Sequence, residues 1–330
     1  MNKLRRSVLA LAVVAAAFGS QAQAQDFPAG KPITIIVPFA AGGPTDRVAR
    51  DLAEAMRKPL GGGTVLVDNA AGAGGSIGAN KVAKSAADGY TLLLTHIGMA
   101  TMPTLVRNIP FKVESDFEYL GMINDVPMTV IGKPTLPATS YKELVAWIDA
   151  NKGKVNLGNA GVGSASHLCG MMLQNSLKVD MTAVPYKGTG PAMTDLIGGQ
   201  IDLMCDQTTN TTSQIEAKKV KAFAVTTSKR LTTSGLKDLP TMQEAGAKGF
   251  EVSIWHGLYA PKGTPPAIQK KLNDALKAAL KDPEFVKKQE GLGAVVVTDK
   301  RMEPAEHKKF VAAEITKWSP IIKAANVYVE

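Results

Sequence analysis

Two glycine-rich turns, each placed between a β-type segment and a helix-type segment, constrain the fold of this chain more than any other feature. The first turn, with Gly42 and Gly43, follows the β-branched apolar run Ile33–Val37 and precedes apolar residues at helical spacing from Asp46 onward. The second turn, NAAGAGGSIGANKVA, follows the strand-like Thr64–Val67 and also leads into a helical pattern. Such alternation is typical of a parallel sheet wrapped by helices, so the sequence predicts an α/β fold.

The same alternation continues through the second half of the chain, with two further glycine turns, GNAGVGSASHLCGMML and YKGTGPAMTDLIGG. A mature chain of about 300 residues exceeds what one hydrophobic core usually organises. We therefore expect two lobes, each a mostly parallel sheet flanked by helices, with the chain crossing between them at Met128–Ile131 and Phe250–Tyr259. Lobe one is expected over residues 25–129 and 254–330, and lobe two over residues 130–253. Paired crossings of this kind describe a hinged clamshell.

The first 24 residues have the pattern of a signal peptide. A basic segment with Lys3, Arg5 and Arg6 is followed by a short apolar stretch, Val8–Phe18, and by the small-x-small cleavage site Ala22-Gln23-Ala24. The apolar stretch is too short to cross a bilayer as a helix. We expect the mature chain to begin near Gln25 and, in a bacterium, to be located in the periplasm.

The charge of the chain does not indicate a nucleic-acid partner. The full chain has a formal net charge of +9, from 38 basic and 29 acidic residues. Without the three basic residues of the signal peptide, 35 basic residues remain against 29 acidic ones, which gives +6. The lysines are scattered, and the sequence contains no arginine–aromatic interleaving and no nucleic-acid-binding module. We therefore expect no nucleic-acid partner.

The glycine turns do not have the spacing of a nucleotide-binding motif. A dinucleotide fingerprint requires G-x-G-x-x-G, but Gly72 and Gly74 are followed by Ile77 at the third position. The sequence contains no P-loop Gly-Lys-Ser/Thr. Its four histidines and two cysteines have no metal-ligand spacing. We therefore expect no cofactor and no metal.

A secreted hydrolase is the alternative function that the sequence keeps open. Ser164 follows a glycine in GVGSAS, and His167 lies three residues later. A nucleophile elbow needs glycine two residues after the serine, and residue 166 is a serine instead. Ser164 also fits the N-cap of a helix without any catalytic role. We expect a binding protein rather than an enzyme, with an esterase that uses Ser164 and His167 as the alternative.

The four glycine turns fit an anion-binding cleft. Backbone N–H groups at such turns and at helix N-termini, together with hydroxyl groups, can hold a carboxylate without any arginine. His96 follows a strand and fits either a ligand donor or a satisfied core residue. Asp46 suits the start of a helix, where it would hold the glycine loop in shape or bind through a water. The other candidate side chains are Ser76, Ser164, His167 and Thr208.

The chain contains two cysteines, Cys169 and Cys205. In an oxidising compartment they fit either one disulfide or two buried free thiols. A bridge requires that their Cα atoms lie within bridging distance, which the sequence does not determine.

The chain resembles a known family in an ordered set of motifs. It is similar to the periplasmic solute receptors of tripartite tricarboxylate transporters, also called Bordetella uptake gene receptors. The segments that carry the resemblance are PFAAGGPTDRVAR, NAAGAGGSIGANKVAKSAADGYTLLL, GVGSASHL, VPYKGTGPAMTDLIGGQID and GLYAPKGTP, which span essentially the whole mature chain. The resemblance implies a Venus-flytrap, or periplasmic-binding-protein, fold. It further implies a monomer that closes on a small organic acid and delivers it to the membrane permease subunits of the transporter.

The resemblance also implies a set of ligand-binding residues, to which we add His96 as a donor. In lobe one, the residues that grip one carboxylate, partly through ordered water, would be Phe39, Ala41, Gly43, Asp46, Gly74, Gly75 and Ser76. In lobe two, the counterparts would be Gly161, Ser164 and His167, with Tyr186, Gly188 and the segment from Asp206 through Thr208 to Thr209 around the distal end of the ligand. The segments HLCGMM and LMCDQTTN occur together in one branch of the family, which implies a Cys169–Cys205 bridge.

The resemblance narrows the ligand to an organic acid. Members of the family take dicarboxylates, tricarboxylates, amino-acid-like acids and aromatic acids such as terephthalate. His167 and the threonine-rich QTTNTT segment suit a second polar group on a longer acid. We expect a dicarboxylate, with aromatic diacids such as terephthalate included. Asn69-Ala70-Ala71 stands where the family commonly has Asn-Arg-Pro, which implies a looser or differently shaped second loop.

Overall fold

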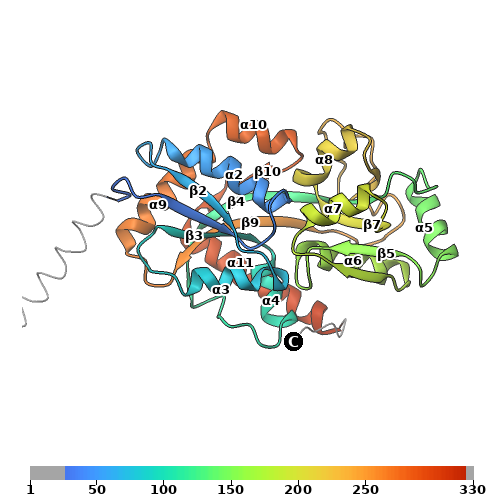
Figure 1. The fold of residues 1–330 in the computed structure, drawn as a ribbon, viewed down its shortest axis with the longest axis horizontal. Helices are drawn as coiled ribbons and strands as arrows, with labels where there is room; N and C mark the ends of the chain where they lie inside the picture. Colours follow the sequence, from blue (N-terminus) through green and yellow to red (C-terminus); the bar gives the residue numbers. More distant parts are fainter. Residues whose placement is uncertain (1–26, 325–330) are drawn as a thin grey trace, which may run out of the picture.

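The computed structural model describes residues 27–324 of the chain. The signal peptide expected over residues 1–24 lies outside the described residues. Within residues 27–324, none of the helices combines the length and the apolar character needed to span a membrane. Figure 1 shows a mixed α/β fold in an elongated molecule, with the strands in the middle and the helices around them. The α/β fold expected from the alternating pattern is confirmed.

The described residues form ten strands and ten α-helices. The strands are β1 (Ile33–Val37), β2 (Val65–Asn69), β3 (Thr91–His96), β4 (Phe117–Gly132), β5 (Asn156–Asn159), β6 (Thr182–Pro185), β7 (Leu203–Gln207), β8 (Lys221–Val225), β9 (Ser253–Pro261) and β10 (Val295–Val296). The helices are α2 (Pro44–Arg57), α3 (Ser76–Ala83), α4 (Gly98–Leu105), α5 (Tyr141–Ala150), α6 (Ala165–Leu177), α7 (Thr189–Ile197), α8 (Thr208–Glu216), α9 (Pro266–Ala279), α10 (Pro283–Gly291) and α11 (Pro304–Ala324). Two short 3₁₀ turns are η1 (Ala73–Gly75) and η2 (Lys300–Met302).

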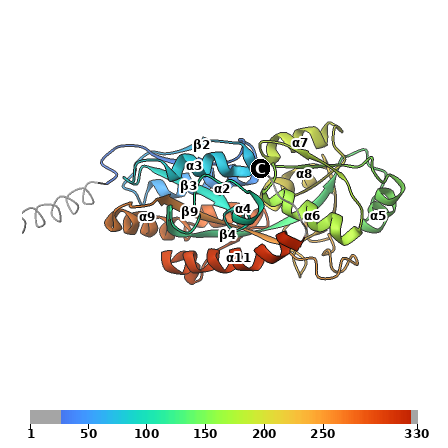
Figure 2. The same cartoon turned by 90° about the horizontal axis from the view of Figure 1, so that it is seen from below.

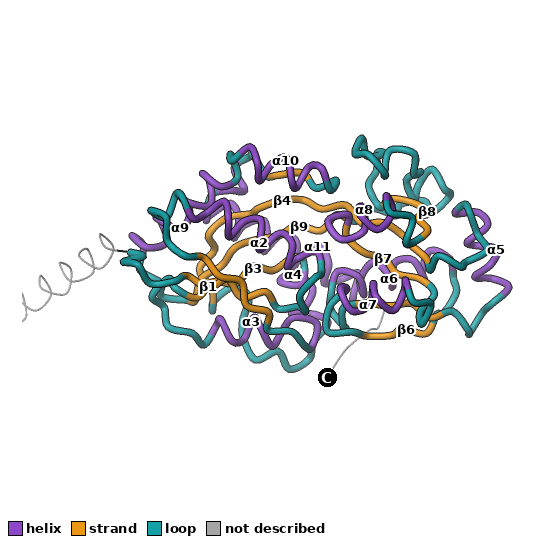
Figure 3. Tube along the Cα trace, turned by 45° about the horizontal axis from the view of Figure 1, so that its top comes forward, coloured by secondary structure: helices purple, strands orange, loops and turns teal. Residues whose placement is uncertain are grey.

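The strands form one path, β2-β1-β3-β9-β4-β7-β5-β6, with β8 and β10 also paired to β4. We name as the first sheet half β1, β2, β3, β9, β10 and residues 117–127 of β4. The second sheet half consists of β5, β6, β7, β8 and residues 128–132 of β4. Strand β4 therefore runs through both halves and exchanges partners between Pro127, paired with β9, and Met128, paired with β7 (Figure 3).

Strand direction follows the expected pattern within each half. In the first half β1 is parallel to β2 and β3, and in the second half β5 is parallel to β6 and β7. The long strands β4 and β9, which the chain uses to pass between the halves, are antiparallel to each other. The change of partners in β4 supports the lobe boundaries expected near residues 129 and 254, which stay a prediction.

Alternate residues of the central strands pack against helices on opposite faces of the sheet. Ile35 belongs to a buried cluster with α2 and α9, whereas Ile36 belongs to a cluster with α3, α4 and α11. Figure 2 shows α11 running beneath the sheet, on the side away from α2. Burial on both faces explains why β1 is a continuous apolar run rather than an alternating one. The C-terminal helices α9, α10 and α11 thus complete the first half.

Candidate ligand-binding site

A cavity lies where the carboxyl ends of the parallel strands of the two sheet halves meet. It is nearly filled in this conformation, with a volume of about 10 Å³ open to the centre of a water molecule. The residues that line it are Phe39, Gly43, Pro44, Thr45, His96, Ala160, Ala165, Ser166, Thr189, Asp206 and Gln207. They come from the end of β3, the end of β7, and the segments that follow β1, β5 and β6. Open α/β sheets bind their ligands in this position, outside the carboxyl ends of the strands.

Four helices begin at this cavity. Helix α2 contributes Pro44 and Thr45, α6 contributes Ala165 and Ser166, α7 contributes its first residue Thr189, and α8 contributes its N-cap Gln207. The first turn of a helix has N–H groups without intrahelical partners and carries a partial positive charge. Among the described residues that line the cavity, none is lysine or arginine. The cavity therefore favours an anion through backbone dipoles rather than through cationic side chains.

Two residues that line the cavity, Thr189 and Gln207, have a buried side-chain oxygen with no hydrogen-bond partner among the described residues. A buried polar group without a partner costs about 1–3 kcal/mol. These two oxygen atoms are best explained by a molecule that hydrogen-bonds to them when it occupies the cavity. The buried hydroxyl oxygens of Thr208 and Thr209 also have no partner among the described residues, but these two residues do not line the cavity.

The rings of Phe39 and His96 stack on each other in the lining of the cavity. The Phe39 and His96 rings lie 4.7 Å apart with an interplanar angle of 27°. Burial lowers the pKa of His96 to about 4, so its imidazole is neutral near pH 7. The Nδ1 atom of His96 accepts a hydrogen bond from the Gly98 amide at 3.0 Å. The proton is therefore on Nε2, which makes His96 a neutral donor beside the cavity.

A buried carboxylate, Asp206, also lines the cavity. Its side chain accepts hydrogen bonds from the Gln207 amide at 2.9 Å and from Asn210 Nδ2 at 2.6 Å. Burial raises the pKa of Asp206 to about 6 in spite of these hydrogen bonds. The Asp206 carboxyl therefore loses its proton near pH 6.

We expect the unliganded protein to lose stability as the pH rises from about 4 to about 6. The folded-state pKa of about 6 for Asp206 exceeds the value of 3.8 for an exposed carboxyl, so protonated Asp206 favours the folded state. Its contribution is fully present below pH 3.8 and is lost as the pH rises through about 6. A shift of about two pH units corresponds to about 3 kcal/mol.

Urea denaturation at several pH values, with wild type and Asp206→Asn, measures this effect. The variant should be about as stable as wild type near pH 4 and more stable above pH 6. Asp149→Asn is the control, because Asp149 is an exposed aspartate on α5. Parallel stability curves for wild type and Asp206→Asn would show that Asp206 titrates normally.

Asp46 holds the first glycine turn in shape. Its carboxylate accepts hydrogen bonds from the Gly42 amide at 3.0 Å, from Arg50 at 2.9 and 3.0 Å, and from Asn69 Nδ2 at 3.0 Å. Burial opposes ionisation, but the hydrogen bonds from Arg50, Gly42 and Asn69 outweigh it, and the pKa of Asp46 is lowered. Asp46 does not line the cavity and acts on the shape of the loop, the first of its two expected roles.

The second glycine turn contacts the second half of the molecule. A Cβ atom on Gly74 would collide with the carbonyl oxygen of Val162, and one on Gly75 would lie 3.0 Å from the Phe39 ring. Both glycines have positive φ angles, of 61° and 107°. The turn therefore places backbone against backbone between the two halves, and neither glycine nor Ser76 is among the residues that line the cavity.

Two other predicted glycines make similar contacts outside the lining. Gly161 lies against Gly74, and Gly188 lies against Ala40, next to the predicted Ala41. A backbone hydrogen bond from the Ala40 amide to the Lys187 carbonyl, at 2.9 Å, joins the turns at Ala40 and Gly188. The Tyr186 hydroxyl instead donates to Asp195 Oδ2 at 2.7 Å, within the second half. Gly161 and Gly188 therefore belong to the contact between the two halves.

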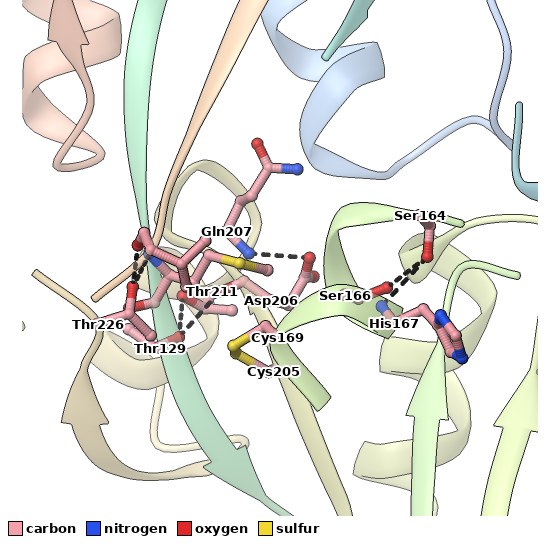
Figure 4. The surroundings of a disulfide bond; sticks show 12 residues. Thr129, Ser164, Ser166, His167, Cys169, Cys205, Asp206, Gln207, Thr211 and Thr226 are labelled. Carbon is pink, nitrogen blue, oxygen red and sulfur yellow. Dashed lines mark hydrogen bonds between the residues drawn. A yellow bond between two sulfur atoms is a disulfide. The ribbon is translucent and has the colours of Figure 1, made fainter. Parts of the chain in front are cut away.

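Ser164 and His167 do not form a nucleophile–base pair among the described contacts. The Ser164 hydroxyl accepts from the His167 amide at 3.3 Å, which makes it the N-cap of α6, and lies 3.2 Å from the Ser166 hydroxyl. The His167 ring accepts from the Gly163 amide at 3.4 Å. In Figure 4 the dashed line from Ser164 reaches the backbone nitrogen of His167 and not its ring. This geometry gives the esterase alternative no support.

A disulfide joins Cys169 of α6 to Cys205 of β7, with a Cα–Cα distance of 5.9 Å. Of the two alternatives left open by the sequence, the structure has the bridge. Figure 4 shows it below Asp206 and Gln207 in the view, and these two residues follow Cys205 in the chain. The bond therefore ties the start of α8 to α6, two of the four helices that begin at the cavity.

Five of the predicted residues line the cavity, namely Phe39, Gly43, His96, Asp206 and, within the predicted segment from Asp206 to Thr209, Gln207. Thr45, Ser166 and Thr189 were not predicted, and their side chains lie at helix starts that follow glycine turns. Their position one to three residues after a turn glycine is the signal that could have found them. Threonine and serine are common at helix starts for structural reasons, so their presence there does not by itself predict a ligand contact.

Comparison with known proteins places this geometry among solute receptors. Residues 48–327 match the family model described as "Tripartite tricarboxylate transporter family receptor". A relative from Agrobacterium vitis, called "UPF0065 protein in the TAR-I ttuE-ttuC' intergenic region", is 48% identical over 326 residues. That alignment covers 99% of this chain and 93% of the relative.

Three solved structures are similar over nearly their whole length. The periplasmic binding protein BugD has a TM-score of 0.88 and 50% identity, covering 91% of this chain and 99% of its own. MatC from Rhodopseudomonas palustris, solved with bound malate, has a TM-score of 0.84 and 36% identity, covering 88% and 98%. Rpa4515 from R. palustris, solved with adipate, has a TM-score of 0.84 and 33% identity, covering 90% and 98%.

Proposed function

This chain belongs to the tripartite tricarboxylate transporter receptor family, and we propose that it captures a small dicarboxylate in the cavity between its two sheet halves. The observation that carries the proposal is the convergence of four helix N-termini on a cavity whose lining contains no cation among the described residues. Fixed N–H dipoles and hydroxyl groups bind carboxylates, and the lining contains the buried Thr189 hydroxyl, which has no hydrogen-bond partner among the described residues. Solved relatives hold malate and adipate.

The ligands of two solved relatives support a short acid. MatC holds malate and Rpa4515 holds adipate, which are four- and six-carbon diacids. We therefore favour a four- to six-carbon chain over a bulky tricarboxylate. An aromatic diacid such as terephthalate is the largest ligand that we include.

The contacts between the two halves support a closed, ligand-holding conformation. The turns Ala40–Gly43 and Gly188–Gly190 meet through backbone atoms, and Thr101 Oγ1 donates to the Gly163 carbonyl at 3.3 Å. We infer that these contacts form when the lobes, divided as expected near residues 129 and 254, close on the acid. The released acid would pass to membrane permease subunits from a monomer in the periplasm, after removal of the signal peptide.

A thermal-shift panel tests the proposed function. At 100 times its dissociation constant, a bound acid should stabilise the protein by about 2.7 kcal/mol. We expect succinate, malate, adipate or terephthalate to raise the melting temperature and uncharged dimethyl succinate to leave it unchanged. If no diacid raises it while a carboxylic ester is hydrolysed, the protein is an esterase and the proposal is wrong.

A further inference from the structure

A chain of buried hydrogen bonds runs from the cavity to the surface of the first sheet half. Thr45 Oγ1 lies 3.3 Å from His256 Nε2, and His256 Nδ1 lies 2.9 Å from Asn124 Oδ1. Asn124 Nδ2 donates to Gln289 Oε1 at 2.9 Å, and Gln289 Nε2 donates to Asp51 Oδ2 at 2.8 Å. The five residues come from α2, β9, β4, α10 and again α2, which lie around the first sheet half (Figure 3).

The interior members of this chain are sealed from water. His256, Asn124 and Gln289 have no exposed surface, and Thr45 is 2% exposed. Burial, with a smaller contribution from His96, lowers the pKa of His256 well below its ordinary value, so the ring is neutral. A neutral imidazole donates through one nitrogen and accepts through the other. Because water does not reach these groups, the adjoining side chains alone determine which partner donates in each hydrogen bond.

Asp51 sets the donor-to-acceptor direction of every hydrogen bond from Thr45 to Asp51. It is ion-paired with Arg47 at 3.2 Å, and an ionised carboxylate only accepts hydrogen bonds. Gln289 must therefore turn its NH₂ group to Asp51 and its oxygen to Asn124.

The remaining two links follow from the first two. Asn124, having donated to Gln289, accepts from His256 Nδ1, and this leaves Nε2 of His256 as the acceptor. The Thr45 hydroxyl must then donate its single proton to His256 Nε2. Thr45 lines the cavity, and its oxygen then has lone pairs and no proton to donate to a ligand there.

We propose that Thr45 accepts a hydrogen bond from a hydroxyl or ammonium group of the bound acid, so that the site selects substituted diacids over unsubstituted ones. The inference rests on the proposed function, because it assigns a part of the same cavity. Thr45 would be a specificity-determining residue, and His256, Asn124, Gln289 and Asp51 would be positioning residues that never touch the ligand. An acid that offers only methylene hydrogens would leave the Thr45 oxygen unpaired in a dry cavity.

Three acids that differ at one carbon atom provide the test. Succinate, L-malate and L-aspartate share the four-carbon diacid skeleton and carry hydrogen, hydroxyl or ammonium at carbon 2. Isothermal titration calorimetry of wild type should find L-malate, L-aspartate or both bound about 10- to 100-fold more tightly than succinate. Equal affinity for all three would overturn the inference while leaving the dicarboxylate proposal intact. If none of the three binds but adipate or terephthalate does, the inference also fails, and if no diacid binds, the proposed function itself fails.

Variants locate the origin of the selectivity. Thr45→Val should bring the affinity ratio of the substituted acid to succinate close to 1, and Thr45→Ser should restore it. Asp51→Asn should lower the ratio several-fold, because an amide at residue 51 can donate to Gln289 and allow every hydrogen bond in the chain to reverse.

Glu54→Gln is the matched control. Glu54 is an exposed carboxylate of the same helix, is paired with Arg57 and is not part of the hydrogen-bonded series from Thr45 to Asp51. Its affinity ratio should equal that of wild type. A purely structural role for Asp51 would change the affinities for succinate and for the substituted acid by the same factor, and that result would contradict the inference.

Discussion

Gly190→Ala should weaken binding of the acid by about 10- to 100-fold and leave the unliganded protein folded. Gly190 lies in the first turn of α7, and a Cβ atom there would lie 2.7 Å from the Ala41 carbonyl oxygen and 3.1 Å from the Gly42 carbonyl carbon. These are backbone atoms of the opposite turn, which cannot move aside as a flexible side chain does. Adding one methyl group to a close-packed contact costs about 1–3 kcal/mol, which falls on the closed form alone.

Two measurements test this prediction. Calorimetric titration with the diacid that stabilises wild type most gives the affinity, and a melting curve of the unliganded variant gives its stability. Alanine is a better helix former than glycine, so the melting temperature without ligand should stay the same or rise. Gly291→Ala in α10 is the control, because nothing lies within 4 Å of a Cβ atom at that position. Unchanged affinity in Gly190→Ala would mean that the two turns do not meet in the ligand-bound protein.

Removing the disulfide should cost about 4 kcal/mol of unfolding free energy. The Cys169–Cys205 bridge closes a loop with a sequence separation of 36 residues, and cross-links of that span stabilise mainly by restricting the unfolded chain, by about 3–4 kcal/mol. The double variant Cys169→Ala/Cys205→Ala avoids a buried hydroxyl or an unpaired thiol at either position. Guanidinium denaturation of wild type and the double variant measures the difference.

Two controls accompany this experiment. A thiol titration of denatured wild type should find no free cysteine, and wild type treated with a reductant should match the double variant in stability. A difference below about 1 kcal/mol between wild type and the double variant would mean that the bridge contributes little, contrary to the loop-closure argument. The two predictions are separable, since Gly190→Ala changes binding without lowering stability, whereas loss of the bridge lowers stability first.

Most of the fold could be predicted because its strands are buried on both faces. The apolar run Ile33–Val37 and the glycine turn after it identify a strand and a helix start with no knowledge of the rest of the molecule. Helix α4, strand β10, helix α8 and the first part of β4 escaped this reasoning. The first part of β4 contains Asn124, Asp125 and Pro127, which interrupt its apolar pattern, and Asn124 is tolerated there because it is fully hydrogen-bonded.

Helix α8 escaped for a different reason. Its sequence, TTNTTSQIE, has almost no apolar residue and a high content of threonine, a poor helix former. Four of its threonines are buried nonetheless, because the helix begins at the cavity and packs against β4 and β7. Tertiary position, rather than local propensity, decides its conformation.

The candidate site could be predicted in its general position but only partly in its residues. Glycine turns at strand ends indicate where a ligand sits, and Phe39, Gly43, His96 and Asp206 do line the cavity. The sequence does not distinguish a turn that faces the ligand from one that faces the opposite lobe, as Gly74 does. That distinction depends on how the two halves meet. The hydrogen-bonded chain behind Thr45 also depends on tertiary structure, since residues that bond directly in it are up to 238 positions apart in the sequence.

The most direct test of this account is a crystal structure of the protein with the diacid that gives the largest thermal stabilisation. The account predicts both carboxylates inside the cavity, with backbone N–H groups of the starts of α2, α6, α7 or α8 about 2.7–3.2 Å from their oxygen atoms. The buried oxygen atoms of Thr189 or of the α8 start should gain partners from the ligand or from water bound with it. A diacid held elsewhere, or held in the cleft by lysine or arginine side chains, would contradict the account.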